Sequence, residues 1–93
     1  MLEKEVEREL VKGVKSLGGL CWKFTSPSTN GVPDRVVMLP KGKFGFIELK
    51  APGKKLRPIQ IKRNKQLKLH GVKVYVLDSK EKVKEVLYDL QTT

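Results

Sequence analysis

Apolar residues recur along the chain with several different spacings, and each spacing predicts a type of element. Near the N-terminus they recur every three or four residues, the period of a helix that buries one face: Leu2, Val6, Leu10, Val14, Leu17. Shorter apolar runs further on predict strands. In chain order, the predicted elements are a helix at 2–17, strands at 20–24, 34–39 and 43–50, a helix at 58–70, a strand at 72–78 and a helix at 80–90.

Glycine, proline and serine residues mark the ends of these elements. Gly18 and Gly19 follow the first helix, and the sequence PKGK at 40–43 predicts a hairpin turn. Pro58 suits the first turn of a helix that Gly71 ends, and Ser79 can cap the last helix. The order αβββαβα indicates an α/β fold with a mixed sheet flanked by helices. The length of 93 residues fits a single domain at 1–93.

The charge balance points to a polyanionic partner. The chain has 20 Lys and Arg residues against 10 Asp and Glu residues, a formal net charge of +10, with a dense basic stretch at 50–68. Such a charge favours nucleic acid as the partner, although lysines that only solvate a small protein would give the same total. The expected DNA contacts lie in the loops at 25–33 and 51–57 and in the helix after them: Ser26, Ser28, Asn30, Lys54, Lys55, Arg57, Lys62.

Several classes of protein are excluded or disfavoured by the composition. With Cys21 as the only cysteine and His70 as the only histidine, an internal disulfide and a Cys/His zinc site are excluded. No apolar run approaches the ~20 residues of a membrane span. The charged N-terminus lacks the apolar stretch of a signal peptide. We therefore expect no membrane association and a cytoplasmic protein.

The isolated residues outside these patterns have structural interpretations. His70 is expected at the end of a helix and Cys21 as a small buried apolar side chain. Trp22 and Phe24 are expected to pack in the core rather than to stack on bases. A surface for protein partners is disfavoured because no exposed apolar run is evident in the sequence.

Two acidic residues stand inside apolar strands of this basic chain. Asp34 and Glu48 are the only acids between Glu9 and Asp78. If the turn occupies 40–42, the register places Asp34 opposite Glu48, with Cβ atoms only ~4.5–5.5 Å apart. Two ionised carboxylates at that distance repel each other unless a cation lies between them. Mg²⁺ prefers such oxygen ligands, although an ordinary pairing with a surface lysine is the alternative.

The first helix contains a further acidic residue for the site formed by Asp34 and Glu48. On a wheel of about 100° per residue, Glu3 and Glu7 fall near the apolar face, one turn apart. A carboxylate on that side needs a partner, which for Glu7 is a metal reached directly or through water. Glu3 is the alternative, and its position near the terminus also suits simple exposure to solvent.

The motifs together resemble a known nuclease family. An acidic residue of the first helix is followed by "GVPDR", then by "FIELKAPGKKL", and then by Gln60 early in the next helix. In these motifs the chain is similar to the PD-(D/E)xK superfamily and, more closely, to its VRR-NUC branch, the virus-type replication-repair nuclease domain. The resemblance covers nearly all of the chain. It implies a restriction-endonuclease-like αβββαβ core, to which the helix at 80–90 is an addition.

The resemblance also implies roles for individual residues and a cofactor. Asp34 and Glu48 match the family's ligands for Mg²⁺ or Mn²⁺, joined by the Leu49 carbonyl. Lys50 matches the lysine that orients the attacking water, and Gln60 a glutamine at the edge of the site. Glu7 is the choice for the helix acid, with Glu3 as the fallback.

The expected function is therefore a metal-dependent DNA endonuclease. Stand-alone members of the family from phages and bacteria resemble junction resolvases, which implies a homodimer that cuts four-way (Holliday) junctions in DNA repair or phage replication. The resemblance also implies that the cell is a bacterium or a phage-infected host. Because a chain this short leaves no room for a separate sequence-reading domain, recognition of DNA shape is expected. A flap or nicking nuclease and a non-catalytic nucleic-acid-binding module are the alternatives.

Overall fold

The elements follow the predicted order along the chain. The computed structural model describes residues 2–93. Its elements are α1 (Glu3–Ser16), β1 (Leu20–Lys23), β2 (Arg35–Leu39), the 3-10 turn η1 (Pro40–Gly42), β3 (Lys43–Leu49), α2 (Pro58–Leu69), β4 (Val74–Leu77), the 3-10 turn η2 (Lys80–Lys82) and α3 (Val83–Thr92). The predicted α/β class and the order αβββαβα are confirmed. Within the described residues, no helix has the length and apolar character needed to cross a membrane.

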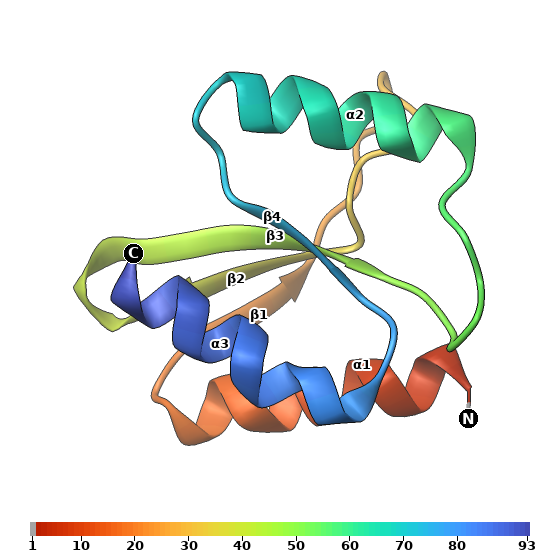
Figure 1. Ribbon diagram of the computed structural model, residues 1–93. Helices are drawn as coiled ribbons and strands as arrows, with labels where there is room; N and C mark the ends of the chain where they lie inside the picture. Colours follow the sequence, from red (N-terminus) through yellow and green to blue (C-terminus); the bar gives the residue numbers. More distant parts are fainter. Residues whose placement is uncertain (1) are drawn as a thin grey trace.

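The four strands form one mixed sheet in the order β1-β2-β3-β4. β1, β2 and β3 are antiparallel neighbours, and β4 lies parallel to β3. A parallel pair needs a crossover connection, which α2 supplies on one side of the sheet. Figure 1 shows α2 above the sheet and α1 with α3 below it. The fold is thus a sheet between one helix and a pair of helices.

The apolar core lies between the sheet and the pair α1–α3. The buried side of α1 consists of the residues whose spacing predicted it, namely Val6, Leu10 and Val14. They pack against the inward-facing positions of the strands and of α3, which are Val37, Leu39, Ile47, Leu49, Leu77, Val83, Val86, Leu87 and Leu90. This side of the sheet is covered by apolar packing, which holds in place the strands that carry the candidate site.

The other face of the sheet is covered differently. The buried residues of α2 are polar, Gln60 and Asn64. Because α2 contributes few apolar contacts, its place over the sheet depends on polar contacts with the strand ends and on the loop before β2. Gln60 is one of the residues expected at the site, so this helix is held in part by the site itself.

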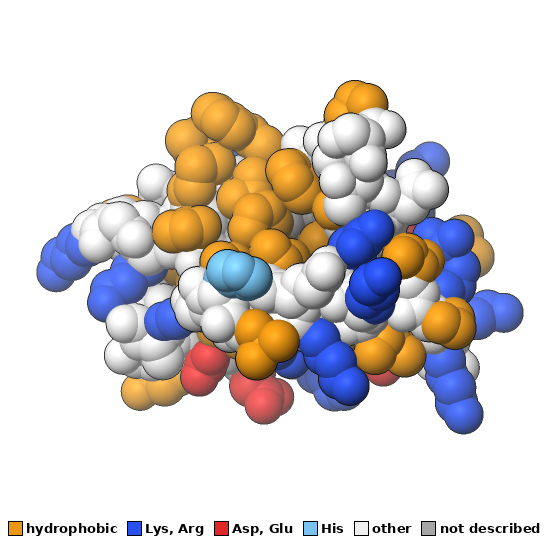
Figure 2. All heavy atoms as spheres, turned by 90° about the horizontal axis from the view of Figure 1, so that it is seen from above, with side chains coloured by type: hydrophobic (Ala, Val, Ile, Leu, Met, Phe, Trp, Pro, Cys, Tyr) orange, Lys and Arg blue, Asp and Glu red, His pale blue; other side chains and the backbone are white. Residues whose placement is uncertain are grey.

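An apolar area beside α2 stays open to solvent. Strand alternation places six residues of β1, β2 and β3 on one side, here called the open sheet face: Leu20, Trp22, Val36, Met38, Phe44, Phe46. Leu20, Trp22 and Phe44 are half exposed or more, at 50%, 57% and 50%. Figure 2, which looks down on the α2 side, shows a broad area of apolar side chains there. The expected absence of an apolar surface is therefore wrong.

Two side chains differ from their predicted burial. Trp22, expected in the core, is exposed because no helix covers β1 on the open sheet face. Phe24 is half-buried and packs its ring on Phe46, with centroids 5.1 Å apart. Cys21, expected to be buried, is only half-buried, since it lies on the outermost strand. Burial raises the pKa of its thiol.

The element ends differ slightly from the prediction. β4 spans Val74–Leu77 rather than 72–78, because its pairing with β3 runs only from Phe46 to Leu49. The last helix begins with the turn η2, and the Ser79 side chain makes no capping hydrogen bond. His70 is the C-terminal cap of α2, and its Nδ1 lies 2.7 Å from the Gln66 carbonyl oxygen. Its predicted place at a helix end is confirmed.

Candidate functional site

The hairpin β2–β3 brings the two isolated acids together. The observed turn occupies 40–42, and Leu39 pairs with Lys43, which is the register expected from the sequence. Arg35 pairs with Ile47, so Asp34 and Glu48 are the next opposed positions. They lie at the open end of the hairpin, where β3 leaves the sheet toward α2.

Three hydrogen bonds hold Asp34 in place. Its backbone N–H donates to the Ile47 carbonyl at 3.1 Å, and its own carbonyl accepts from the Phe24 N–H at 2.8 Å. Its carboxylate Oδ2 accepts from the Leu49 N–H at 2.7 Å. This last bond crosses the strand end, so the side chain is directed toward the end of β3. β2 begins at Arg35, one residue after the predicted start at Asp34.

Glu48 is almost completely buried although it belongs to a strand end. Its exposed fraction is 1%, and its Oε2 accepts a hydrogen bond from Gln60 Nε2 at 3.1 Å. Its other oxygen, Oε1, is buried and has no hydrogen-bond partner among the described residues. A buried carboxylate oxygen without a partner is costly, so it marks a position prepared for a cation or a proton.

The electrostatics around Glu48 favour a proton when no cation is present. Burial raises the pKa of Glu48 to about 8, with a further increase from the neighbouring Asp34 carboxylate. The charge of Lys50 acts in the opposite direction, and the charge of Glu3 adds a smaller increase. Two carboxylates and one ammonium therefore interact at this strand end. A carboxyl group with so high a pKa and a specific charge partner is typical of a functional site.

Gln60 connects the carboxylates to the start of α2. Its Oε1 accepts from the Arg57 N–H at 2.9 Å, while its Nε2 donates to Glu48. Both ends of the amide are thus used, which fixes the orientation of Gln60 and leaves only Oε1 of Glu48 free. Lys50 follows directly after β3, where its N–H donates to the Leu77 carbonyl at 3.0 Å. The sheet therefore positions the lysine beside the acids.

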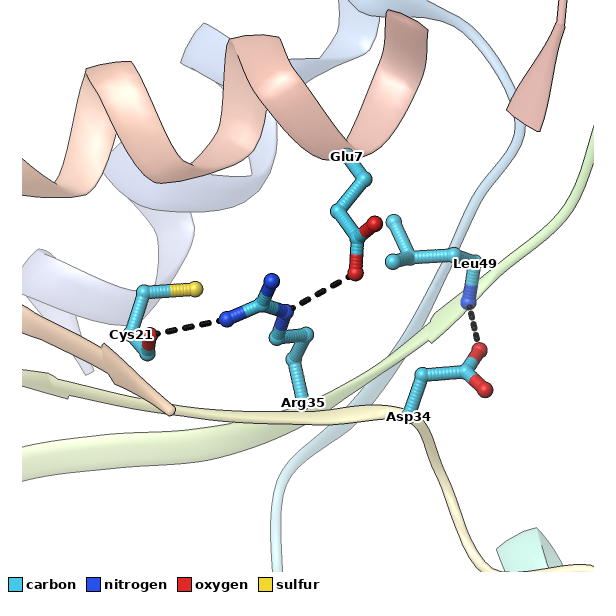
Figure 3. A network of polar contacts seen from close by, with 5 residues as sticks. All are labelled: Glu7, Cys21, Asp34, Arg35 and Leu49. Atoms are coloured by element: carbon cyan, nitrogen blue, oxygen red, sulfur yellow. Dashed lines mark hydrogen bonds and ion pairs between the residues drawn. The ribbon is translucent and has the colours of Figure 1, made fainter. Parts of the chain in front are cut away.

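The two acids of α1 have different surroundings. Glu7 Oε2 accepts from Arg35 Nε at 3.0 Å, and Arg35 Nη1 donates to the Cys21 carbonyl at 3.0 Å. Figure 3 shows this chain of contacts beside Asp34 and Leu49. Glu3 is exposed, yet it is the acid of α1 whose charge acts on Glu48. Glu3 lies in the first turn of the helix, and its exposure agrees with the alternative expected for it from the sequence.

Arg35 is the residue that the sequence reasoning missed. It stands in β2 beside Val36, and alternation puts it on the α1 side of the sheet, where its side chain is only 13% exposed. A guanidinium there needs an acceptor, and Glu7 is the acid on the facing helix. The dipeptide Asp34-Arg35 could have signalled this, because successive strand residues point to opposite faces.

The loop before β2 is anchored on α2 and so positions Asp34. Gly31 has a φ of +82°, and an added Cβ would lie 2.8 Å from Ile59 Cγ1 and 2.9 Å from the Ile59 carbonyl oxygen. The following Pro33 is fully buried. Arg63 Nε donates to the Asn30 carbonyl at 2.6 Å, which ties the same loop to α2 a turn later. Glycine is required here by both conformation and space.

The predicted DNA contacts lie around this corner in two groups. Ser26, Ser28 and Asn30 belong to the loop before Asp34, and the Asn30 carbonyl is already occupied by Arg63. The basic side chains of the second group are all exposed and follow Lys50 in the loop and in the first turns of α2: Lys54, Lys55, Arg57, Lys62. No ion pair within residues 2–93 involves any of these four.

The donor set consists of oxygen atoms only. The described residues contain no group of three or more His, Cys, Asp or Glu side chains arranged around a metal position. Asp34 and Glu48 alone supply two carboxylates, one of them with a free buried oxygen. Mg²⁺ is commonly held by one or two carboxylates, with waters and substrate phosphates completing its shell. The residues present therefore fit a Mg²⁺ or Mn²⁺ ion.

Comparison with known proteins identifies the family. Residues 5–81 match the VRR-NUC domain. The chain belongs to the VRR-NUC family. A solved structure described as a VRR_NUC domain superposes with a TM-score of 0.86 at 29% sequence identity, covering 92% of this chain and 94% of that one. The expected family and its α/β fold are thereby confirmed, and the matched segment includes all of the site residues from Glu7 to Gln60.

A curated relative is also similar to this VRR-NUC chain. It is "Putative nuclease p44" of Acyrthosiphon pisum secondary endosymbiont phage 1, 47% identical over 79 residues, which cover 85% of each protein. Its name places a phage nuclease among the relatives. The VRR-NUC protein described here is therefore a member of a nuclease family with a phage homologue, in agreement with the expected enzyme class.

Proposed function

We propose that this VRR-NUC protein is a metal-dependent, structure-selective DNA endonuclease that hydrolyses phosphodiester bonds. The observation that carries the proposal is the pair Asp34 and Glu48, held together at a strand end with a buried, partnerless Glu48 oxygen. A carboxyl group whose pKa is raised to about 8 by burial, with a second carboxylate beside it, is poorly suited to a structural role. A non-catalytic basic module would have no need for it.

A Mg²⁺ or Mn²⁺ ion would be held by Asp34, by Glu48 and by the Leu49 carbonyl. When bound, such an ion lowers the pKa of water and stabilises the negative charge of the transition state. Asp34 is preorganised by the Leu49 N–H, and Glu48 by Gln60. Both acids are therefore oriented before any ligand arrives, which limits the ordering that binding requires.

Lys50 and Gln60 would act beside the two acids. Lys50 supplies hydrogen bonds and positive charge to the attacking water or to a phosphate oxygen, in keeping with its charge acting on Glu48. Gln60 holds Glu48 in place and ties it to the Arg57 backbone. Since Glu7 is engaged by Arg35, its role would be to fix Arg35 beside Asp34, or to contact the metal through water. Glu3 remains the alternative acid.

The substrate would be branched DNA, and the four-way junction is the form we favour. The loop groups would contact phosphates and so position DNA without reading its sequence: Ser26, Ser28, Asn30, Lys54, Lys55, Arg57, Lys62. A two-fold substrate suits a homodimer with two identical sites. A flap or nicking nuclease is the second candidate, and it would follow if the protein acts as a monomer.

The open sheet face supports the homodimer. Three of its side chains are at least 50% exposed, and two of these, Trp22 and Phe44, are aromatic. A cavity of about 200 Å³ with a mostly apolar lining adjoins it, between α2 and the loop before β2, and Phe24 and Leu67 belong to its walls. A second copy of the chain is the occupant we propose, because its own face offers the same apolar side chains to a two-fold contact.

The chemistry is tested by single substitutions at the acids and the lysine. Asp34→Asn, Glu48→Gln and Lys50→Ala should each reduce cleavage of a labelled four-way junction by about 100-fold or more, as expected when a group stabilising the transition state is lost. Cleavage should require Mg²⁺ or Mn²⁺ and stop in EDTA. Flap and linear duplex substrates in the same assay distinguish the two candidate substrates.

Two control variants separate this effect from general charge loss. Glu85→Gln lies in the first turn of α3 and Lys41→Ala in the hairpin turn at the far end of β3, and both side chains are exposed. They should cleave like the wild type. Wild-type cleavage rates for Asp34→Asn would contradict the metal-ligand assignment, and cleavage unchanged by EDTA would contradict the metal requirement.

A further inference from the structure

A basic groove runs along the outer side of α1, away from the loops considered so far. It has a volume of about 450 Å³, and its walls carry five cationic side chains and one acid. We call it the α1 groove. Its lining consists of these six charged residues and the apolar Val11: Lys4, Glu7, Arg8, Val11, Lys12, Lys15, Arg35. All but Arg35 belong to α1, and the four α1 cations are exposed. The four α1 cations have no role in the site described above.

The single acid of the α1 groove does not neutralise these four cations. Glu7 forms its ion pair with Arg35 at 3.0 Å. Within residues 2–93, Lys4, Arg8, Lys12 and Lys15 take part in no ion pair. The groove therefore retains four free positive charges on a short length of helix.

The arrangement of these cations is unfavourable for the helix itself. Lys4, Arg8 and Lys12 follow one another at intervals of four residues, so their side chains are neighbours on the helix surface. Each like-charge pair at this spacing costs about 0.2–0.5 kcal/mol. Glu9 lines a neighbouring pocket with Lys12, Lys80 and Lys84, and within residues 2–93 it forms no ion pair with any of them. Within the described residues the four α1 cations thus form no ion pair, which favours an external polyanion as the partner of the groove.

The length of the row suits a nucleic-acid backbone. From Lys4 to Lys15 a helix rises ~16 Å at about 1.5 Å per residue. A strand of duplex DNA carries one phosphate per ~3.4 Å along the axis, so the row extends over about five phosphates. Exposed lysine and arginine side chains at this spacing can reach several phosphates at once.

The α1 groove also lies close to the candidate site through Arg35. Arg35 is the next residue after Asp34, and its partner Glu7 comes from α1 above it, as Figure 3 shows. The Glu3 charge at the start of the same helix acts on Glu48. The Glu7–Arg35 pair of the groove therefore lies next to the strand end that carries the carboxylates, and the groove continues along α1. The basic loop at 51–57 leads instead toward α2.

From this geometry we propose that the α1 groove binds the sugar-phosphate backbone of a duplex arm that extends from the cleavage point. The inference rests on the proposed nuclease function and adds a second DNA track to the loop residues. Its contacts are to phosphates, so it increases affinity for long arms without adding base specificity. The DNA bound to the protein then passes along two basic surfaces that lie on either side of the strand end with Asp34 and Glu48.

The test uses two triple variants with equal charge. The groove variant is Arg8→Gln/Lys12→Gln/Lys15→Gln, and the control is Lys68→Gln/Lys80→Gln/Lys84→Gln, all at exposed positions. Each lowers the formal net charge from +10 by three, to +7. Binding to junctions with short and long arms is measured by fluorescence anisotropy in EDTA over a range of salt concentrations, so it does not depend on cleavage.

The expected result has three parts. For long arms, the groove variant should bind at least about tenfold more weakly than the control, and its log–log salt slope should be smaller by about 2.7, at 0.9 per phosphate contact. The gain in affinity from longer arms should disappear in the groove variant alone. In Mg²⁺, cleavage at saturating DNA should stay at the wild-type rate while KM rises.

Other results would overturn the inference. Equal salt slopes for the two triple variants would mean that only total charge matters. A loss of the saturated cleavage rate with unchanged affinity would place these residues in the reaction rather than in arm binding. The single variant Lys15→Gln, at the end of the groove distant from Asp34, keeps the test valid if the triple variant unfolds, and it should reduce the slope by about 0.9. Absence of cleavage by the wild type would contradict only the proposed nuclease function.

Discussion

The residue that defines the site is Glu48, whose two oxygens have different environments. One oxygen accepts from Gln60, and the other is buried without a partner. The Gln60 amide cannot turn to serve both, because its oxygen is held by the Arg57 N–H. A single hydrogen-bonded amide thus determines which carboxylate oxygen is available at the site. The energetic consequence is that the metal-free protein carries a poorly satisfied buried group.

Removing the charge of Glu48 should therefore stabilise the metal-free protein. Its pKa is raised to about 8, whereas an exposed glutamate titrates near about 4.3. Between these values the folded state holds a proton that the unfolded state has lost, so the free energy of unfolding should decrease as pH rises through this window. Glu48→Gln should reduce this dependence of stability on pH. At pH 8 in EDTA it should also raise the Tm, by ~4–8 °C for each kcal/mol gained in the free energy of unfolding.

Thermal melts of both proteins from pH 5 to pH 8.5 measure this difference. Addition of Mg²⁺ or Mn²⁺ should raise the Tm of the wild type and leave that of Glu48→Gln nearly unchanged, because a ligand stabilises only the state it binds. Glu85→Gln, at an exposed position, serves as the control. A Glu48→Gln protein that melts below the wild type at pH 8 would mean that the carboxylate is satisfied by contacts other than those described.

At the scale of elements, the loop at 25–33 and the helix α2 depend on each other. α2 buries Gln60 and Asn64, and Asn64 Oδ1 has no partner among the described residues. The helix is therefore weakly held by apolar packing, and its contact with Gly31 becomes important. The same contact fixes the loop that leads into Asp34. A disturbance at Gly31 should reach both the fold and the site.

Gly31→Ala should be considerably more destabilising than Gly53→Ala. Both glycines have a φ of +82°, which costs a residue with a Cβ about 1–2 kcal/mol. At Gly31 the added Cβ would also lie 2.9 Å from the Ile59 carbonyl oxygen, whereas at Gly53 nothing lies within 4 Å. We expect a loss of about 2–4 kcal/mol for Gly31→Ala and about 1–2 kcal/mol for Gly53→Ala.

Urea unfolding of the two alanine variants gives these free energies directly. Because both variants carry the same backbone penalty, their difference isolates the contact with Ile59. Equal losses at the two positions would show that the loop moves away from α2 without cost, and that Asp34 is positioned by the hairpin alone.

At the scale of elements, sequence reasoning and structure agree where the chain is regular. The turn at 40–42 and the apolar alternation were sufficient to place Asp34 opposite Glu48. The period of α1 identified its buried face. Alternation assigns a residue to a face of the sheet but does not reveal whether a helix covers that face, so the exposure of Trp22 was not predicted. The partner of Glu7 was missed because Arg35 is distant in sequence.

The whole molecule has three distinct surfaces around one sheet. The closed side carries the core, the opposite side carries the open sheet face, and the α1 groove runs along an outer edge. A monomer that leaves Trp22 57% exposed and Phe44 50% exposed places large aromatic surfaces in water. Stable interfaces bury ~800 Å² on each partner, so the open sheet face would form the apolar centre of such an interface with polar residues at its rim.

Trp22→Lys should convert the expected dimer into a monomer. A lysine at the centre of a two-fold apolar contact places two like charges together, which is strongly unfavourable. Light scattering should give a particle of twice 10.6 kDa for the wild type and of 10.6 kDa for the variant. Tyr88→Lys, at an aromatic residue 68% exposed on α3, is the matched control and should remain dimeric.

A wild type that scatters as a 10.6 kDa particle at all concentrations, with or without a junction, would rule out the dimer. The flap or nicking activity would then be the better interpretation of the site. If the dimer is present, mixing wild-type protein with Glu48→Gln protein should give heterodimers that nick one strand of a junction, because each protomer carries one set of acids.

The hairpin origin of Asp34 and Glu48 also has a consequence for how the chain folds. Hairpins form in ~1–10 μs because their closing loop is short, so these two acids can meet before the helices have docked. The α1 groove requires α1, which lies N-terminal to the hairpin. The core requires both α1 and α3, and α3 is the last element of the chain. The reactive corner would therefore be assembled early, with its charges still hydrated, and would become buried only when α2 brings Gln60 over Glu48. Closure of α2 is then the step at which the folding chain must either take up a proton or capture a cation.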